Sequence, residues 1–191
     1  MTVKQTLYTG VSRAAWGYFF LYVDINLGTV SVLPKFVGML LLLSAIRLLE
    51  GERRELKLLR PLAIGMTVYY AAEWALSWVG GSLEGRFPLV ELLIAAASLY
   101  FHFQFFTDLA AIGEKYEAAE ESHRILKWRT VQTVLITAAA VLRLPVLAQL
   151  KGWEYLVIGI TLACFGICLC LMAALFSLRK VFEEDNEKRT A

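Results

Sequence analysis

Apolar residues gather along the chain in blocks of about 20, separated by short polar or glycine-containing segments. A block of this length fits a helix that crosses the ~30 Å hydrocarbon core of a bilayer, and a soluble core helix does not need one. Six such blocks occur, over residues 11–27, 32–49, 61–79, 88–109, 131–150 and 153–178. The pattern predicts an all-α integral membrane protein with a single transmembrane domain, a bundle of six transmembrane helices.

The segments between the blocks predict how the helices connect. The first two blocks are joined only by residues 28–31, so they should form a tight helical hairpin. Pro34 and Pro61 stand at the start of their blocks, where a helix does not need the missing N–H. Residues 110–130 have helix-forming composition and should extend the neighbouring helices into the cytoplasm. Residues 183–191 form a polar cytoplasmic tail.

The basic residues predict the orientation. If the N-terminus lies in the cytoplasm, only four of the 19 Lys and Arg residues, namely Lys35, Arg86, Arg143 and Lys151, fall on the opposite side. This positive-inside bias predicts that both termini are cytoplasmic. A composition of 58% hydrophobic and 19% charged residues also favours lipid as the solvent. Soluble domains have roughly 45–50% apolar residues and about 25% charged residues. The net charge of +2, without a basic face, argues against nucleic-acid binding.

Known catalytic and metal-binding motifs are missing from the sequence. It contains no P-loop, HExxH, GxSxG or paired CxxC. Cys164 and Cys168 share a helical face, but no second Cys or His pair stands at ligand spacing, so we expect no metal and no cofactor. An enzyme is the least favoured class, because nothing marks a nucleophile.

Polar residues within or beside the apolar blocks carry the candidate chemistry: Asp24, Asn26, Glu73, Glu91, His102 and Arg143. An ionisable group in hydrocarbon costs roughly 2.5–3.5 kcal/mol on insertion scales, so each should face the bundle interior. Helical spacing puts Glu91, Ser98 and His102 on one face of the fourth helix, and Tyr70 and Glu73 on one face of the third. We expect these faces to meet in the half of the bundle far from the cytoplasm.

Two interpretations of these residues stay open. In the functional one, Glu73 pairs with Arg143 and the other carboxylates of an outward-facing, net acidic cavity accept a cation or protons. In the structural one, the pair only holds helices together, and Asp24 and Asn26 cap the second helix. His102 is expected to be a hydrogen-bonded interface residue, with a proton relay as the alternative.

A family resemblance rests on two short stretches, DINLG at 24–28 and VLPKFVG at 32–38. Together they are similar to a hairpin motif, D-x-N-x-G followed by L-P-x-F-[VI]-G, of small multi-spanning membrane proteins of Gram-positive bacteria whose function is unknown. Lys35 stands where that family carries an acidic residue. The resemblance implies a multi-pass protein of the bacterial cytoplasmic membrane and adds no mechanism.

The leading functional prediction is binding or transport of a small solute or ion. The alternatives are a non-transporting scaffold or regulatory subunit and, after it, a membrane enzyme acting on lipid substrates. Membrane lipids are the expected partners, together with a second copy of the chain or a partner membrane protein, because six short helices alone enclose only a small cavity.

Overall fold

A computed structural model describes residues 3–23, 26–27, 30–31, 34–83, 86–142 and 152–187 of the chain. Within these ranges six α-helices account for most of the structure, with one 3-10 helix and one pair of very short strands. The elements are α1 (Val3–Tyr22), β1 (Asn26–Leu27), β2 (Val30–Ser31), α2 (Lys35–Leu49), η1 (Arg54–Leu59), α3 (Arg60–Ser77), α4 (Pro88–Lys115), α5 (Ala119–Leu142) and α6 (Trp153–Glu187).

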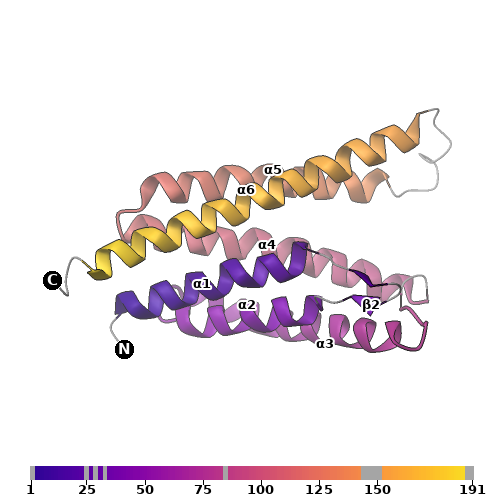
Figure 1. The fold of residues 1–191 in the computed structure, drawn as a ribbon, viewed down its shortest axis with the longest axis horizontal. Coiled ribbons are helices and arrows are strands. Elements are labelled where there is room, and N and C mark those ends of the chain that lie inside the picture. Colours follow the sequence, from indigo (N-terminus) through magenta and orange to yellow (C-terminus); the bar gives the residue numbers. More distant parts are fainter. Residues whose placement is uncertain are drawn as a thin grey trace.

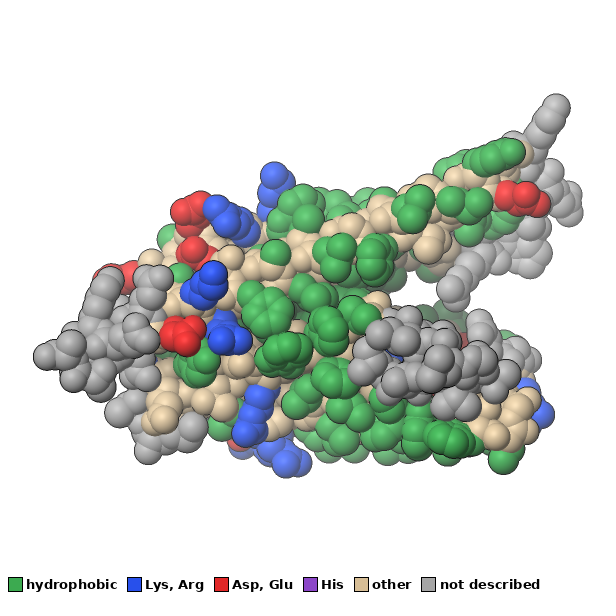
Figure 2. All heavy atoms as spheres, in the orientation of Figure 1, with side chains coloured by type: hydrophobic (Ala, Val, Ile, Leu, Met, Phe, Trp, Pro, Cys, Tyr) green, Lys and Arg blue, Asp and Glu red, His purple; other side chains and the backbone are tan. Residues whose placement is uncertain are grey.

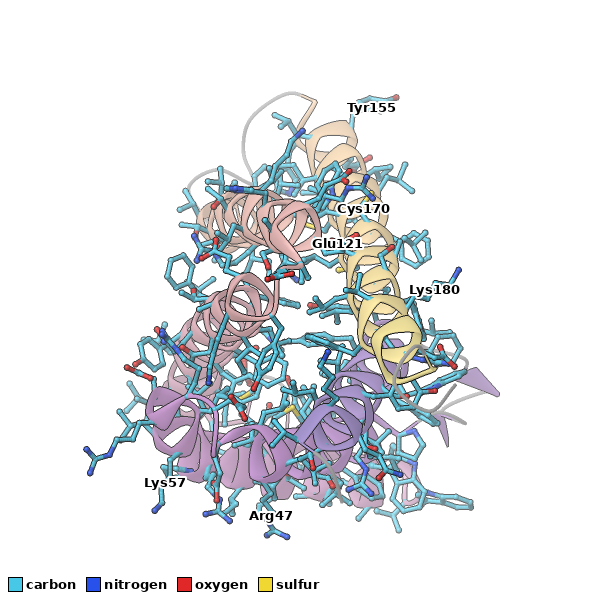
Figure 3. All side chains as sticks on the ribbon, turned by 90° about the vertical axis from the view of Figure 1, so that its left-hand side faces the viewer. Arg47, Lys57, Glu121, Tyr155, Cys170 and Lys180 are labelled. Atoms are coloured by element: carbon cyan, nitrogen blue, oxygen red, sulfur yellow. The ribbon has the colours of Figure 1, made fainter. Side chains whose placement is uncertain are left out.

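The six helices form a closed ring. Each helix packs against the next one along the chain, and α6 returns to pack against α1. The contact between α3 and α4 is the least extensive in the ring. Both termini lie at one end of the bundle, here named the terminal end, and β1 and β2 lie toward the opposite end, here named the hairpin end (Figure 1). Figure 3 looks along the helices from the terminal end.

The packed core occupies the half of the bundle next to the terminal end. Its largest fully buried side chains include Tyr18, Phe101, Phe105, Phe106 and Phe182. Toward the hairpin end the described parts of the helices bury much less. The last buried residue of α3 is Met66, and the first of α4 is Phe101, although that helix begins at Pro88. The bundle is therefore tightly packed at one end and open at the other.

Glycines allow α1 and α2 to lie against each other at short distance. A Cβ atom on Gly17 would lie 2.9 Å from the carbonyl oxygen of Gly38, and a Cβ on Gly38 would lie 2.7 Å from the carbonyl oxygen of Gly17. Only a residue without a side chain fits on both sides of such a backbone contact. Small residues serve the same purpose where helices pack in membranes.

Two of the helices are long and apolar enough to cross a membrane, judged by length and composition among the described residues. They are α4, and α6 over Trp153–Glu183. Two such helices are weak evidence, because the core helix of a soluble protein passes the same test. Here, however, only 17% and 22% of the two apolar windows are buried in the bundle, whereas the core helix of a soluble protein is mostly buried.

Length or polar residues explain why three of the other four helices, α2, α3 and α5, do not meet the requirement. α2 has 15 residues, which is about 22 Å of helix against a hydrocarbon core of ~30 Å. α5 begins with the polar residues of 119–130, and α3 carries Glu73 within 18 residues. The six transmembrane spans predicted from the sequence thus correspond to six helices, of which two meet the length and hydropathy requirement.

The segment between the first two predicted spans differs from the expected helical turn. α1 ends at Tyr22, five residues before the predicted end at 27, and Asn26–Leu27 pairs with Val30–Ser31 as an antiparallel ladder. The chain therefore leaves α1 through a β-hairpin before α2 begins.

The basic segment after α2 is held against the end of α4. Lys115 donates a hydrogen bond to the Glu52 carboxylate at 2.6 Å, and the Tyr116 hydroxyl donates to the same oxygen at 2.9 Å. Arg60 lies 3.2 Å from Glu50, and Leu56 of η1 is fully buried. This segment is thus part of the folded terminal end.

Candidate functional site

A cavity of about 510 Å³ opens among α2, α3, α4 and α5 at the hairpin end. Its polar lining residues are Lys35, Tyr69, Tyr70, Glu73, Glu91 and Ser98. Its apolar lining residues are Ile94, Ala95, Leu99 and Ile136. The cavity exists because α3 and α4 make little contact and because the core is confined to the terminal half.

Helix periodicity explains why these side chains meet. Glu91, Ala95 and Ser98 are spaced by four and three residues, so they lie on one face of α4. Tyr69, Tyr70 and Glu73 likewise project from one side of α3. The phenol of Tyr70 forms a hydrogen bond with Ser98, which links α3 to α4 across the cavity.

Glu73 holds the loop that follows α3. The Ser82 hydroxyl donates to one carboxylate oxygen of Glu73 at 2.8 Å, and the backbone N–H of Leu83 donates to the other at 2.9 Å. Both oxygens therefore have partners within the α3–α4 connection. This is a structural role within the α3–α4 connection; the predicted ion pair with Arg143 is not tested, because Arg143 lies outside the described residues.

Among the described residues of the lining, the charges sum to one negative charge. Glu73 and Glu91 supply two carboxylates, and Lys35, at the first turn of α2, supplies one ammonium group. Tyr69 and Tyr70 add two aromatic rings, which lie edge to face with centroids 5.7 Å apart. Carboxylates together with aromatic faces form an environment that attracts cations.

Two polar pairs lie one helical turn below the cavity. His102, four residues after Ser98 on α4, has its Nδ1 atom 2.9 Å from the Tyr18 hydroxyl. Gln132, four residues before Ile136 on α5, donates through its Nε2 atom to the Tyr22 hydroxyl and lies 4.0 Å from the Cys168 sulfur. These contacts join α1, α4, α5 and α6 beneath the cavity floor.

Aromatic rings close the bundle below this floor. The Tyr18 ring stacks on Phe106 with centroids 4.7 Å apart, and Phe105 stacks on Phe101 at 5.7 Å. All four side chains are fully buried. The cavity is therefore blind toward the terminal end.

The predicted site residues fall into three groups. The structure brings Glu73 and Glu91 to one cavity and places His102 just below it. Asn26 belongs to β1, and its side chain is not among those that the structure describes. Asp24 and Arg143 lie outside the described residues, so the Glu73–Arg143 pair and the capping by Asp24 and Asn26 stay predictions.

Sequence reasoning missed three side chains of this region. Tyr18 and Tyr22 lie four residues apart in an apolar helix, and such a pair is typical of core packing. Lys35 was assigned only to the topology of the chain, although it lines the cavity. The sequence did contain one indication of Tyr18 and Tyr22, because two tyrosines on one helical face carry hydroxyl groups that need partners when buried.

A second buried polar cluster lies at the terminal end. Asp108 is fully buried and accepts a hydrogen bond from Gln104 at 3.1 Å, and Arg53 lies 3.5 Å from the same oxygen. Its other oxygen, Oδ2, has no hydrogen-bond partner among the described residues. Within the described part of the chain, no group of three His, Cys, Asp or Glu side chains is arranged to hold a metal ion.

The fold and the cavity define a helical bundle with a pocket whose described lining residues are net acidic. Comparison of the chain with protein-family models, with curated proteins and with solved structures finds no match.

Proposed function

We propose that the chain is a six-span protein of the bacterial cytoplasmic membrane that binds a small organic cation in the cavity at the hairpin end, as a step in its capture or transport. In this arrangement both termini face the cytoplasm, and the cavity opens to the opposite side. The single observation that carries the proposal is the aromatic-lined cavity, whose described lining residues are net acidic.

The surface of the bundle supports its placement in a membrane. Charged side chains gather toward the terminal end, and hydrophobic side chains cover most of the visible middle of the molecule (Figure 2). Large apolar side chains such as Leu89, Leu92 and Leu93 of α4 are more than half exposed. Monomeric soluble proteins rarely expose contiguous apolar patches beyond a few hundred Å².

The blind end of the cavity supports capture from one side. The Tyr18 and Phe106 stack, together with Phe101 and Phe105, separates the cavity from the terminal end. A transporter needs such a closed side opposite its open side, and the aromatic layer would have to part for a solute to pass. The small volume of about 510 Å³ favours a small solute.

A regulatory or scaffold subunit is the second candidate, and one observation favours it. Both oxygens of Glu73 are used by the α3–α4 loop, so the residue has a structural task without any ligand. Under this alternative the cavity would bind no solute.

Ligand-dependent thermal stability distinguishes the two candidates. The purified protein in detergent is heated with inorganic cations, primary amines and quaternary ammonium compounds, because a ligand that binds only the folded state stabilises it by RT ln(1 + [L]/Kd) and so raises the melting temperature. We expect a rise with at least one organic cation that follows this dependence on concentration. Glu91→Gln should weaken that binding by about ten-fold or more, since a charged contact is worth roughly 1.5–3 kcal/mol.

Glu154→Gln is the matched control, because Glu154 is an exposed carboxylate in the first turn of α6 and does not line the cavity. It should leave the binding unchanged. Equal binding by the Glu91→Gln and Glu154→Gln proteins, or no shift with any cation, would contradict the proposal and favour the scaffold.

A further inference from the structure

A groove on the outside of the bundle lies between α5 and α6, near the terminal end. It encloses about 360 Å³ and is lined by Arg124, Lys127 and Trp128 of α5 and by Cys170, Ala173, Ala174 and Ser177 of α6. It is separate from the cavity at the hairpin end, with which it shares no lining residue. The small side chains of α6 leave the space, and the long side chains of α5 border it.

The charge of the groove fits an anionic group. Arg124 and Lys127 carry two positive charges, and one of these is balanced by Glu120, whose carboxylate lies 2.5 Å from the Arg124 guanidinium. The Lys127 ammonium lies 5.5 Å from the centre of the Trp128 ring. Ser177 also lines this groove, and a serine hydroxyl is a further hydrogen-bond donor.

The surroundings of the groove fit the rest of a phospholipid. Trp128 stands nine residues into α5, just before the apolar part of that helix, where tryptophan favours the boundary between headgroups and hydrocarbon. Beyond it toward the hairpin end, the surface of the same two helices is apolar and exposed. Its large exposed side chains there include Val134, Leu162, Phe165 and Leu169.

We propose that this groove binds the phosphate headgroup of an anionic diacyl phospholipid, with the acyl chains along the exposed apolar surface of α5 and α6. The inference rests on the membrane placement in the proposed function and is independent of the solute. A basic headgroup pocket, an interfacial tryptophan and an apolar track follow one another along one helix pair. A phospholipid of the cytoplasmic leaflet has the same order of phosphate, interface and hydrocarbon.

The first test measures lipid binding to the purified protein in detergent by native mass spectrometry and by melting temperature. Phosphatidylglycerol is the anionic probe, phosphatidylcholine is the zwitterionic probe with the same chains, and glycerol phosphate is the headgroup without chains. We expect retained adducts and a saturable stabilisation with phosphatidylglycerol only. Equal effects of the two phospholipids would overturn the proposal, and an effect of glycerol phosphate alone would reassign the groove to a soluble phosphate.

Variants locate the lipid. Lys127→Ala should weaken phosphatidylglycerol binding about five-fold, because a basic residue at a membrane surface contributes about 1 kcal/mol. Lys180→Ala is the matched control, since Lys180 is an exposed lysine of α6 that does not line the groove and points away from the bundle (Figure 3). Equal loss in both proteins would show that lipid binds by surface charge alone. If Lys127→Ala fails to fold, Lys127→Gln replaces it.

Cys170 gives a readout inside the groove itself. In a protein whose other two cysteines are replaced by alanine, alkylation of Cys170 should slow several-fold when phosphatidylglycerol is added, and phosphatidylcholine should have no such effect. Unchanged alkylation would place the lipid elsewhere. A negative result with Glu91→Gln would not affect the lipid experiments, because they do not depend on the solute. Recovery of the protein from cells without detergent would contradict the membrane placement and therefore both proposals.

Discussion

At the scale of single residues, Glu117 occupies a position that favours glycine. It has φ +65° and is the only non-glycine residue with positive φ in the described part of the chain. The N–H of Ala118 donates to the Gly113 carbonyl at 2.9 Å, and the N–H of Glu117 donates to the Glu114 carbonyl at 3.3 Å. These are the two bonds of a Schellman ending, in which this residue is usually glycine.

Glu117→Gly should therefore stabilise the protein. The left-handed conformation costs a residue with a Cβ atom about 1–2 kcal/mol. This cost is larger than the free energy that glycine loses through its extra backbone entropy on folding. We expect the free energy of unfolding to rise by about 0.5–1 kcal/mol, measured by thermal or denaturant unfolding in detergent. Glu114→Gly, inside α4, should lower it by about 1 kcal/mol. A loss in both variants would contradict the interpretation of this turn.

The contact of Glu52 with Lys115 and Tyr116 predicts a dependence on pH. The hydrogen bond from Lys115 lowers the pKa of the Glu52 carboxyl, and Tyr116 acts in the same direction. A pKa that is lower in the folded state adds stability above the unfolded value of 4.5, and this stability is lost as the pH falls through the folded value. The bond to Glu52 in turn raises the pKa of Lys115 in the folded state. The stability that Lys115 adds is therefore lost only above its unfolded pKa of 10.5.

Glu52→Gln tests this linkage. At pH 7 the variant should melt at a slightly lower temperature than the wild type, and the difference should shrink below pH 4.5 and disappear once the pH is below the lowered pKa of folded Glu52. Glu55→Gln is a control, because Glu55 is an exposed acidic residue of the neighbouring η1 and lies 3.5 Å from Arg53 only. A difference between wild type and Glu52→Gln that stays constant down to pH 3 would contradict the assignment.

At the scale of helices, the α1–α2 contact depends on Gly17 and Gly38. Gly38→Ala would place a Cβ atom 2.7 Å from a backbone oxygen, which a helix can relieve only by moving away. We expect a loss of about 1–3 kcal/mol of stability, as for other overpacked interfaces, read from chemical or thermal unfolding. Gly65→Ala in α3 has open space and should be neutral or stabilising by up to about 1 kcal/mol. Equal effects of the two changes would mean that helix propensity alone governs them.

The helices themselves were accessible to sequence reasoning, because hydropathy and proline report on local structure. Pro61 and Pro88 lie at the first turns of α3 and α4, where a proline costs no hydrogen bond. Helical spacing also placed Tyr70, Glu73, Glu91 and Ser98 on the faces that line one cavity. The β-hairpin after α1 was missed, since an apolar run of this kind fits a helix as well as a strand.

Partners of polar groups could not be predicted in the same way, because they depend on contacts distant in sequence. Ser82 and Leu83 bind Glu73 from a loop, and Tyr18 reaches His102 from another helix. The basic residues of 50–60 contributed only to the predicted orientation, whereas Glu52 and Arg53 also connect this segment to α4. Periodicity gives the face of a helix and not the identity of its neighbour.

At the scale of the whole molecule, the ring of helices makes a prediction about sidedness. Helices alternate in direction around the ring, so η1 and the end of α6 lie at the terminal end, and the start of α6 lies at the opposite end (Figure 1). If the bundle spans a membrane, residues at the two ends must be accessible from different sides. The exposed residues Lys57 and Lys180 report on the terminal end, and Glu154 reports on the other.

Single cysteines at these positions test the proposed topology in intact bacterial cells, in a protein without its own three cysteines. A membrane-impermeant maleimide added outside should label Glu154→Cys and should reach Lys57→Cys and Lys180→Cys only after the membrane is opened, because a charged reagent does not cross hydrocarbon. The reverse pattern would invert the orientation and turn the acidic cavity toward the cytoplasm. Labelling of Lys57→Cys and Glu154→Cys from the same side would mean that the bundle does not span the membrane, and the exposed apolar faces of α4 and α6 would then need a protein partner to cover them.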